Sequence, residues 1–135
     1  MEDIVAKASE YWKKEKQEID SYIGEKRFAP KMITTSQIRK FLTAVNATSN
    51  KVQIFKAQNP RAKELSGELV AEIKYLQVPL VYQAGRDKFV KNFISGTKMI
   101  DMINAIGNDI RAYDNFAKYV EALVAYHKFY GGKDK

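Results

Sequence analysis

Few side chains in this sequence are of the types that catalysis or metal binding requires. The chain has one histidine, His127, and no cysteine, so it cannot build a Cys-His pair or a histidine-rich metal site by itself. Glu64, Glu68 and Glu72 recur at four-residue spacing and could share a divalent cation on one side of a helix. Such rows of charge are far more often solvated helix faces. We therefore predict a chain that is not an enzyme, with no catalytic residue, metal site or cofactor.

The single histidine has an aromatic neighbourhood in the sequence. His127 stands among Tyr126, Phe129 and Tyr130, near the end of an apolar segment. A packed, hydrogen-bonded histidine or a cation at a helix end is favoured over a catalytic role there. The segment 83–87 contains one glycine and lacks the spacing of a phosphate-binding loop.

Phosphate binding is the chemistry that the remaining polar residues favour. Residues 34–37, Thr-Thr-Ser-Gln, form a capping-box pattern, which predicts the start of a helix. Free backbone N–H groups and the helix dipole favour an anion at such a start. A second basic group follows Pro79, although Asp87 dilutes its charge. The candidate contacts to a nucleic-acid backbone are Thr35, Ser36, Gln37, Arg39 and Lys40 in the first group and Arg86, Lys88 and Lys91 in the second.

The positive charge of the chain is concentrated in one segment. Residues 26–63 contain nine Lys and Arg and no Asp or Glu, whereas the rest of the chain has 14 basic and 16 acidic residues. The net charge of +7 therefore comes from this segment. Clustered basic residues indicate a polyanionic partner, because they release the counterions that phosphates condense.

Apolar residues mostly recur at three- and four-residue spacing, which predicts an all-α protein with a single compact bundle of about five helices. We expect an N-terminal helix within 1–25, a basic helix and loop in 26–63, and the bundle core in 64–135. In the middle part, the spacing of Ile38, Phe41, Leu42 and Val45 predicts a helix, and 47–59 is predicted to be a loop. Pro79 should kink the next helix or end it near Val78. Further helices are expected at 97–106, where Thr97 could cap, and at 109–130.

The location expected from the sequence is a cytoplasm. The chain lacks cysteine, begins with an acidic, mixed segment, and has no apolar run of about 18 residues. We therefore predict no export signal and no membrane span.

Three stretches together resemble one known protein family. They are ITTSQIRK at 33–40, YLQVPLVYQAGRD at 75–87 and YVEALVAYHKFYGG at 119–132. Their residues, order and spacing are similar to those of the small subunit of the type III-A CRISPR (Csm) effector complex, from about residue 32 to the end. The resemblance implies a helical bundle of about five helices, present in several copies that stack head to tail as an inner filament.

The resemblance also implies partners and site residues. The small subunit of this family runs along guide RNA and target RNA, contacts the backbone rather than the bases, and leaves cleavage to the backbone and large polymerase-like subunits. The expected partners are therefore both RNAs, other copies of the chain, and the backbone, large and capping subunits. Family members often have a basic residue where this chain has Gln37, so Arg39 and Lys40 would carry more of the contact. Arg86 is expected either to bind RNA or to be structural, paired with a buried carboxylate or with a neighbouring subunit.

Two other functions remain open from the sequence. A helix ending near Ile23, followed by the helix at 34–46, resembles a helix-turn-helix DNA-binding regulator, although the connection of about ten residues is long for that motif. A purely structural adaptor that binds acidic protein surfaces would also explain the charge.

Overall fold

The protein is all-α in the part of the chain that the structure describes. The computed structural model describes the backbone of residues 3–26 and 33–130 and the side chains of 3–16 and 33–130. The helices are α1 (Ile4–Lys26), α2 (Thr35–Gln58), α3 (Gly67–Tyr75), α4 (Gln77–Arg86), α5 (Lys88–Thr97), α6 (Met99–Ile106) and α7 (Ile110–Phe129). Within these residues there is no strand, and one isolated bridge joins Glu64 to Asp109. The predicted fold class is confirmed.

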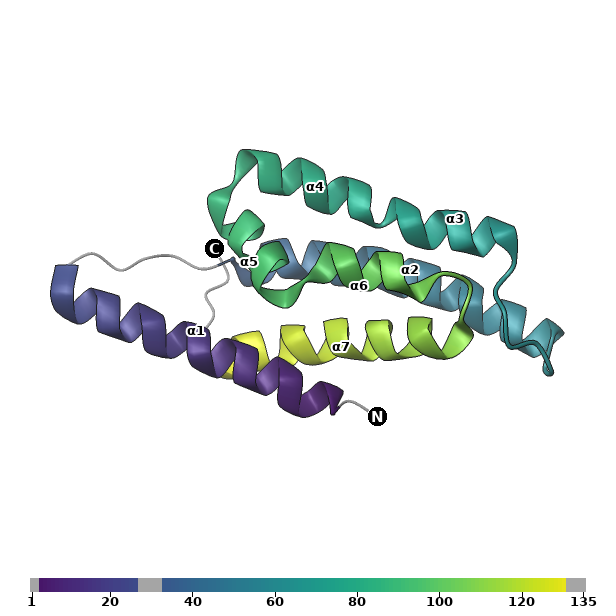
Figure 1. The fold of residues 1–135 in the computed structure, drawn as a ribbon, viewed down its shortest axis with the longest axis horizontal. Helices are drawn as coiled ribbons and strands as arrows, with labels where there is room; N and C mark the ends of the chain where they lie inside the picture. The colour runs from purple at the N-terminus through teal and green to yellow at the C-terminus, as the bar shows by residue number, and fades with distance from the viewer. Residues whose placement is uncertain (1–2, 27–32, 131–135) are drawn as a thin grey trace.

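The long helices α1, α2 and α7 form the frame of the molecule. α7 packs against α1 on one side and against α2 and α6 on the other, and α3 and α4 form an outer layer (Figure 1). α4 packs chiefly against α5, while α3 lies along α2. The centre of the core is aromatic: Trp12, Tyr113, Phe116 and Tyr119 are at most 1% exposed.

α1 is held to the bundle through Trp12. Its indole N–H donates a hydrogen bond to the Leu123 carbonyl of α7 at 2.7 Å. The Trp12 ring stacks on Phe93 of α5, with the ring centroids 5.6 Å apart, and meets the edge of His127 at 4.8 Å. One side chain thus joins α1 to two helices that lie far away in the sequence.

The expected loop at 47–59 is wrong, because α2 continues through it to Gln58. Thr48 and Val52 extend the buried row that Ile38, Phe41 and Val45 begin. The row was hidden in the sequence, because Thr48 is polar and the neighbouring Asn and Ser residues have low helix propensity. Burial against α7 and α3 supplies the stability that propensity does not. The resulting helix of 24 residues is about 36 Å long.

The helix break near Pro79 occurs earlier than predicted. α3 ends at Tyr75, Leu76 keeps a helical φ of −57°, and α4 begins at Gln77. Pro79 therefore lies in the first turn of α4, where a missing backbone N–H removes no helical hydrogen bond. Figure 1 shows α3 and α4 arranged almost end to end.

A second break, at Asp87, divides this expected helix again, so the described residues contain seven helices rather than about five. Asp87 ends α4 in an extended conformation and caps α5, accepting hydrogen bonds from the N–H groups of Phe89 at 2.8 Å and Val90 at 3.4 Å. α5 then continues to Thr97, the first residue of the separate helix that was expected at 97–106. Thr97 does not cap α6, because it is buried and its hydroxyl donates to the Phe93 carbonyl.

Candidate nucleic-acid interface

The start of α2 is built by the predicted capping box. The Thr34 hydroxyl accepts a hydrogen bond from the Gln37 N–H at 3.1 Å, and the Thr34 N–H donates to Gln37 Oε1 at 2.8 Å. The two residues satisfy each other's backbone donors, which fixes the first turn of the helix. The residues after the turn, Arg39 and Lys40, are thereby held on a rigid element.

A second contact of Gln37 joins the two groups of candidate residues. Gln37 Nε2 donates to Asp87 Oδ2 at 2.7 Å, which ties the start of α2 to the junction between α4 and α5. The pKa of Asp87 is lowered, chiefly by the hydrogen bond from Gln37. Burial acts in the opposite direction, and the hydrogen bonds from the N–H groups of Phe89 and Val90 lower the pKa further. The segments 35–40 and 86–91, fifty residues apart in sequence, are neighbours in the fold.

Six of the eight candidate side chains are exposed, and two are part of the scaffold. The exposed ones are Ser36, Arg39, Lys40, Arg86, Lys88 and Lys91. Thr35 is 2% exposed, which corrects its expected place on the RNA-facing surface. Gln37 is half-buried and both ends of its amide are hydrogen-bonded within the protein, so its side chain holds the site together.

Thr35 faces inward because it pairs with His127. The Thr35 hydroxyl lies 3.3 Å from His127 Nδ1, and His127 Nε2 lies 2.7 Å from the Ile33 carbonyl. A carbonyl only accepts, so Nε2 carries a hydrogen, and in the neutral ring Nδ1 accepts from the threonine hydroxyl. His127 is 0% exposed, which confirms a packed, hydrogen-bonded histidine. His127 therefore connects the C-terminal end of α7 to the residues at the start of α2.

The solvent face of α2 carries polar residues and no carboxylate, because the helix contains no Asp or Glu. The exposed polar residues recur at three- and four-residue spacing over the first sixteen positions of the helix: Ser36, Arg39, Lys40, Thr43, Asn46 and Asn50. Hydroxyl, amide, ammonium and guanidinium groups all donate hydrogen bonds to phosphate or ribose oxygens. This row, which we call the α2 polar face, therefore suits a polyanion along most of its length.

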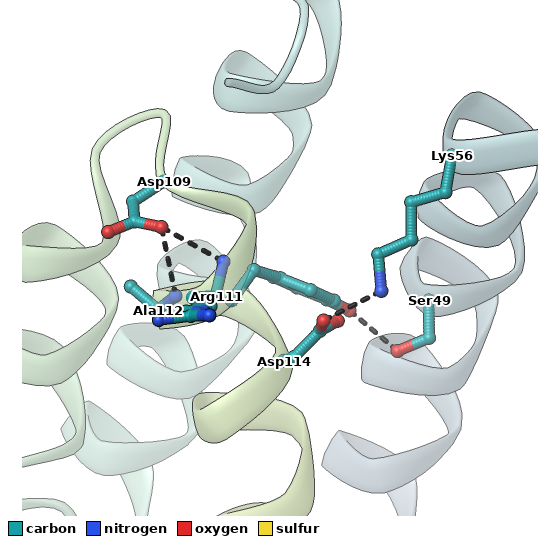
Figure 2. A network of polar contacts seen from close by, with 7 residues as sticks. Ser49, Lys56, Asp109, Arg111, Ala112 and Asp114 are labelled. Carbon is teal, nitrogen blue, oxygen red and sulfur yellow. Dashed lines mark hydrogen bonds and ion pairs between the residues drawn. The ribbon is translucent and has the colours of Figure 1, made fainter. Parts of the chain in front are cut away.

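The basic segment does not form one continuous surface, because two of its lysines pair with carboxylates of other helices. Lys51 lies 2.5 Å from Glu72 of α3, and Lys56 lies 2.6 Å from Asp114 of α7. These lysines are five positions apart on a helix, so they point about 140° apart, toward opposite flanks of α2. Figure 2 shows Lys56 and Asp114 facing each other across the two helices. Carboxylates from outside the segment thus offset part of its charge.

The other basic residues of the segment are distributed unevenly. Arg61 and Lys63 lie in the connection after α2, beyond the end of the α2 polar face. Arg27 and Lys31 lie outside the described residues, as does the side chain of Lys26. The basic part of the α2 polar face is therefore Arg39 and Lys40, at its N-terminal end.

Arg86 and Lys88 lie over aromatic rings. The Arg86 guanidinium is 5.6 Å from the centroid of Tyr82, which is 61% exposed, and the Lys88 ammonium is 5.2 Å from the centroid of Phe89. In the described part of the chain, Arg86 pairs with no carboxylate. Its charge remains at the surface, close to the candidate residues at the start of α2.

The three glutamates at four-residue spacing, Glu64, Glu68 and Glu72, do not form a metal site in the described part of the chain. Glu72 pairs with Lys51, and Glu64 belongs to the connection before α3 rather than to the helix. Among residues 3–16 and 33–130, no three His, Cys, Asp or Glu side chains are grouped as metal ligands. No helix in the same part of the chain is both long and apolar enough to cross a membrane.

Comparison with known proteins gives a consistent result. The family model described as Csm2 Type III-A matches residues 10–133. A CRISPR system Cms protein Csm2 from Streptococcus thermophilus is 40% identical over 104 residues, which cover 76% of this chain and 77% of that protein.

Two more relatives carry the same name. The protein from Mycobacterium tuberculosis is 35% identical over 104 residues, covering 76% of this chain and 79% of the relative. The protein from Enterococcus italicus is 34% identical over 100 residues, covering 73% of this chain and 68% of the relative. The residues that the family model matches include α2, α4 and α5, the helices that build the candidate interface. The chain belongs to the Csm2 family of type III-A CRISPR systems, and the resemblance found in the sequence is confirmed.

Proposed function

We propose that this subunit of the type III-A CRISPR complex is not a catalyst and that it binds the sugar-phosphate backbone of guide and target RNA through its α2 polar face. The observation that carries the proposal is the position of Arg39 and Lys40. Both are exposed at the start of a 24-residue helix that contains no carboxylate. A polyanion that lies along this helix meets two cations and a row of neutral donors.

The chemistry of the α2 polar face favours backbone contacts over base readout. Lys and Arg neutralise phosphates whatever the sequence, and hydroxyls such as those of Ser36 and Thr43 bond to phosphate or ribose oxygens. In RNA-guided complexes base pairing reads the sequence, so a protein that reads charge and shape is sufficient. Arg86, Lys88 and Lys91 extend the positive surface across the Gln37–Asp87 hydrogen bond.

Membership in the Csm2 family supports the proposed partners. We propose that several copies associate head to tail as an inner filament beside the backbone, large and capping subunits. The histidine supports a role without catalysis, because His127 is enclosed and both of its ring nitrogens have partners within the protein.

Binding measurements at two salt concentrations test the proposal. Labelled single-stranded RNA, duplex RNA and duplex DNA are titrated with the purified chain. We expect weak binding to RNA of any sequence, including the duplex, and a fall in affinity with salt that reflects the few phosphates contacted. Tight binding to one DNA sequence would support a regulator instead, and no RNA binding at low salt would contradict the proposal.

A second experiment tests assembly. The chain is purified from cells together with the products of the neighbouring CRISPR genes, and the fractions are examined for guide RNA. We expect the chain to co-elute with the RNA-containing complex in more than one copy. Elution of the chain apart from the RNA would contradict the proposed role.

A further inference from the structure

A groove opens between α2 and α4 beside the proposed RNA-binding surface. It encloses a cavity of about 150 Å³ whose floor is apolar, formed by Phe41 of α2, Leu80 of α4 and Phe93 of α5. The groove exists because α4 packs chiefly against α5, whereas α2 packs chiefly against α7. Ala44 lines the α2 wall of the groove, where its small side chain leaves room.

Two polar side chains at the groove make no polar contact with the described residues. Lys40 and Gln83 both line it, one from each helix. In the described part of the chain neither side chain has a hydrogen bond or an ion pair. Gln37 also lines the groove, but its amide is occupied by Thr34 and Asp87. The groove therefore offers one ammonium and one free amide beside an apolar floor.

The size and the polar groups of the groove define its ligand. An apolar cavity of about 150 Å³ accepts a ring of the size of benzene. A purine has two fused rings, whereas a pyrimidine has one. The Gln83 amide supplies a donor and an acceptor, which match the alternating groups on the edge of uracil or cytosine. A single unpaired pyrimidine fits both features.

We propose that the groove between α2 and α4 binds one unpaired pyrimidine base of an RNA strand. The inference rests on the proposed RNA-backbone function, because Arg39 and Lys40 hold the phosphates on either side of that base. The base leaves the strand, enters between the helices and packs on Phe41 and Leu80. The backbone remains outside on the α2 polar face. Unstacked bases of single-stranded RNA are bound by proteins in this general manner.

A nucleotide fits the groove better than an apolar side chain from a partner protein does. An apolar side chain would cover the Gln83 amide without offering a hydrogen bond, and an unpaired buried amide is costly. It would also bring no negative charge to Lys40. A nucleotide satisfies the amide with its base and the ammonium with its phosphate.

The test fills the groove without changing its charge. Ala44→Leu places extra methyl groups in the cavity, and Ala71→Leu adds the same groups at an exposed position of α3 that lies outside both the groove and the α2 polar face. Fluorescence anisotropy then measures the binding of labelled oligouridine, oligocytidine, oligoadenosine and RNA duplex. We expect the unmodified chain and Ala71→Leu to bind the pyrimidine strands more tightly than oligoadenosine. Ala44→Leu should weaken pyrimidine binding by roughly tenfold, as for loss of one bound base.

The RNA duplex is the internal reference, because its bases are paired and cannot enter the groove. Its affinity should be the same for Ala44→Leu and the unmodified chain. Gln83→Ala provides a second route if Ala44→Leu does not fold, since it adds no volume and removes only the amide. It should reduce the preference for oligouridine while leaving the duplex unaffected.

Several results would overturn the inference and still leave the backbone function intact. Equal pyrimidine binding by Ala44→Leu and Ala71→Leu, with both weakened by charge reversal at Arg39 and Lys40, would show that the groove holds no base. Normal RNA binding by Ala44→Leu together with its exclusion from the assembled complex would show that the groove takes a protein side chain. If charge reversal at Arg39 and Lys40 changes the binding of neither single-stranded RNA nor the RNA duplex, the proposed backbone-binding function is wrong.

Discussion

Gln37 and Asp87 are joined by a hydrogen bond of 2.7 Å between the amide nitrogen of one and the carboxylate of the other. Each residue also caps a helix: Gln37 closes the capping box of α2, and Asp87 accepts from the first N–H groups of α5. The contact therefore connects two helix starts in addition to two side chains. It places the basic residues that follow each start on one side of the molecule.

The first prediction concerns the strength of this connection. In a double-mutant cycle with Gln37→Ala and Asp87→Ala, we expect a coupling of about 1.5–3 kcal/mol, the range for a hydrogen bond to a charged group. Each single variant should lose more, since each also removes a helix cap. Urea denaturation measures the four stabilities. Additive losses would mean that the two helix starts are independent.

The second prediction concerns acid. The pKa of Asp87 is lowered in the folded protein, chiefly by the Gln37 hydrogen bond, so Asp87 stabilises the fold above the carboxyl pKa of the unfolded chain, about 3.9. As the pH falls below that value the unfolded chain takes up the proton first, and this stability is lost. Asp87→Asn keeps a capping side chain but has no charge to titrate. Its unfolding free energy should fall less between about pH 5 and pH 2 than that of the unmodified chain; equal slopes in acid denaturation would contradict this.

The third prediction concerns alkali. Burial raises the pKa of the Tyr113 hydroxyl, against the opposing effect of its 2.7 Å hydrogen bond with Ser49, and the charges of Asp114 and Glu72 raise it further. The unfolded chain therefore loses this proton first, and the contribution to stability disappears as the pH rises above about 10. Tyr113→Phe should be less stable at neutral pH by about 1 kcal/mol and should lose less stability in alkali. Thermal midpoints measured on either side of that pH provide the comparison.

The fourth prediction separates the scaffold from the binding surface at two adjacent residues. Thr35→Val removes the hydroxyl beside His127 and should cost about 1–3 kcal/mol of stability while leaving RNA affinity unchanged. Ser36→Ala changes an exposed side chain, so stability should shift by no more than about 0.5 kcal/mol while RNA affinity falls several-fold. Chemical denaturation and RNA anisotropy are measured on both variants. A reversed pattern would mean that the face of α2 toward RNA is misassigned.

The fifth prediction concerns charge reversal on the α2 polar face. Arg39→Glu with Lys40→Glu should weaken RNA binding by at least about tenfold and flatten its salt dependence, while the thermal midpoint changes little. Lys13→Glu with Lys14→Glu is the matched control, because it makes the same change in charge at an exposed pair on α1. Equal weakening by both pairs would indicate a general effect of net charge. A collapse of the thermal midpoint in the first pair would show that the buried side of α2 is misplaced.

The amino-acid sequence contained enough information to predict the fold class and part of the site. The capping box at Thr34 and Gln37 is a local pattern, because each residue bonds to the other's backbone within one turn. The spacing of Ile38, Phe41 and Val45 likewise defines a buried side without reference to any other segment. The continuation of α2 through Thr48 was missed, because a polar residue in a buried row is stabilised by the helices packed against it.

What the sequence determined by itself was local or cumulative: the start of α2, the all-helical class, the excess of basic residues, and the resemblance to the Csm2 family. The tertiary structure decided which of those residues share a surface. It turned Thr35 inward to His127, joined Gln37 to Asp87, and placed Glu72 and Asp114 against two lysines of the basic segment. These contacts connect residues between 21 and 92 positions apart. Helical periodicity describes one helix at a time, whereas charge pairing and burial depend on which helices become neighbours.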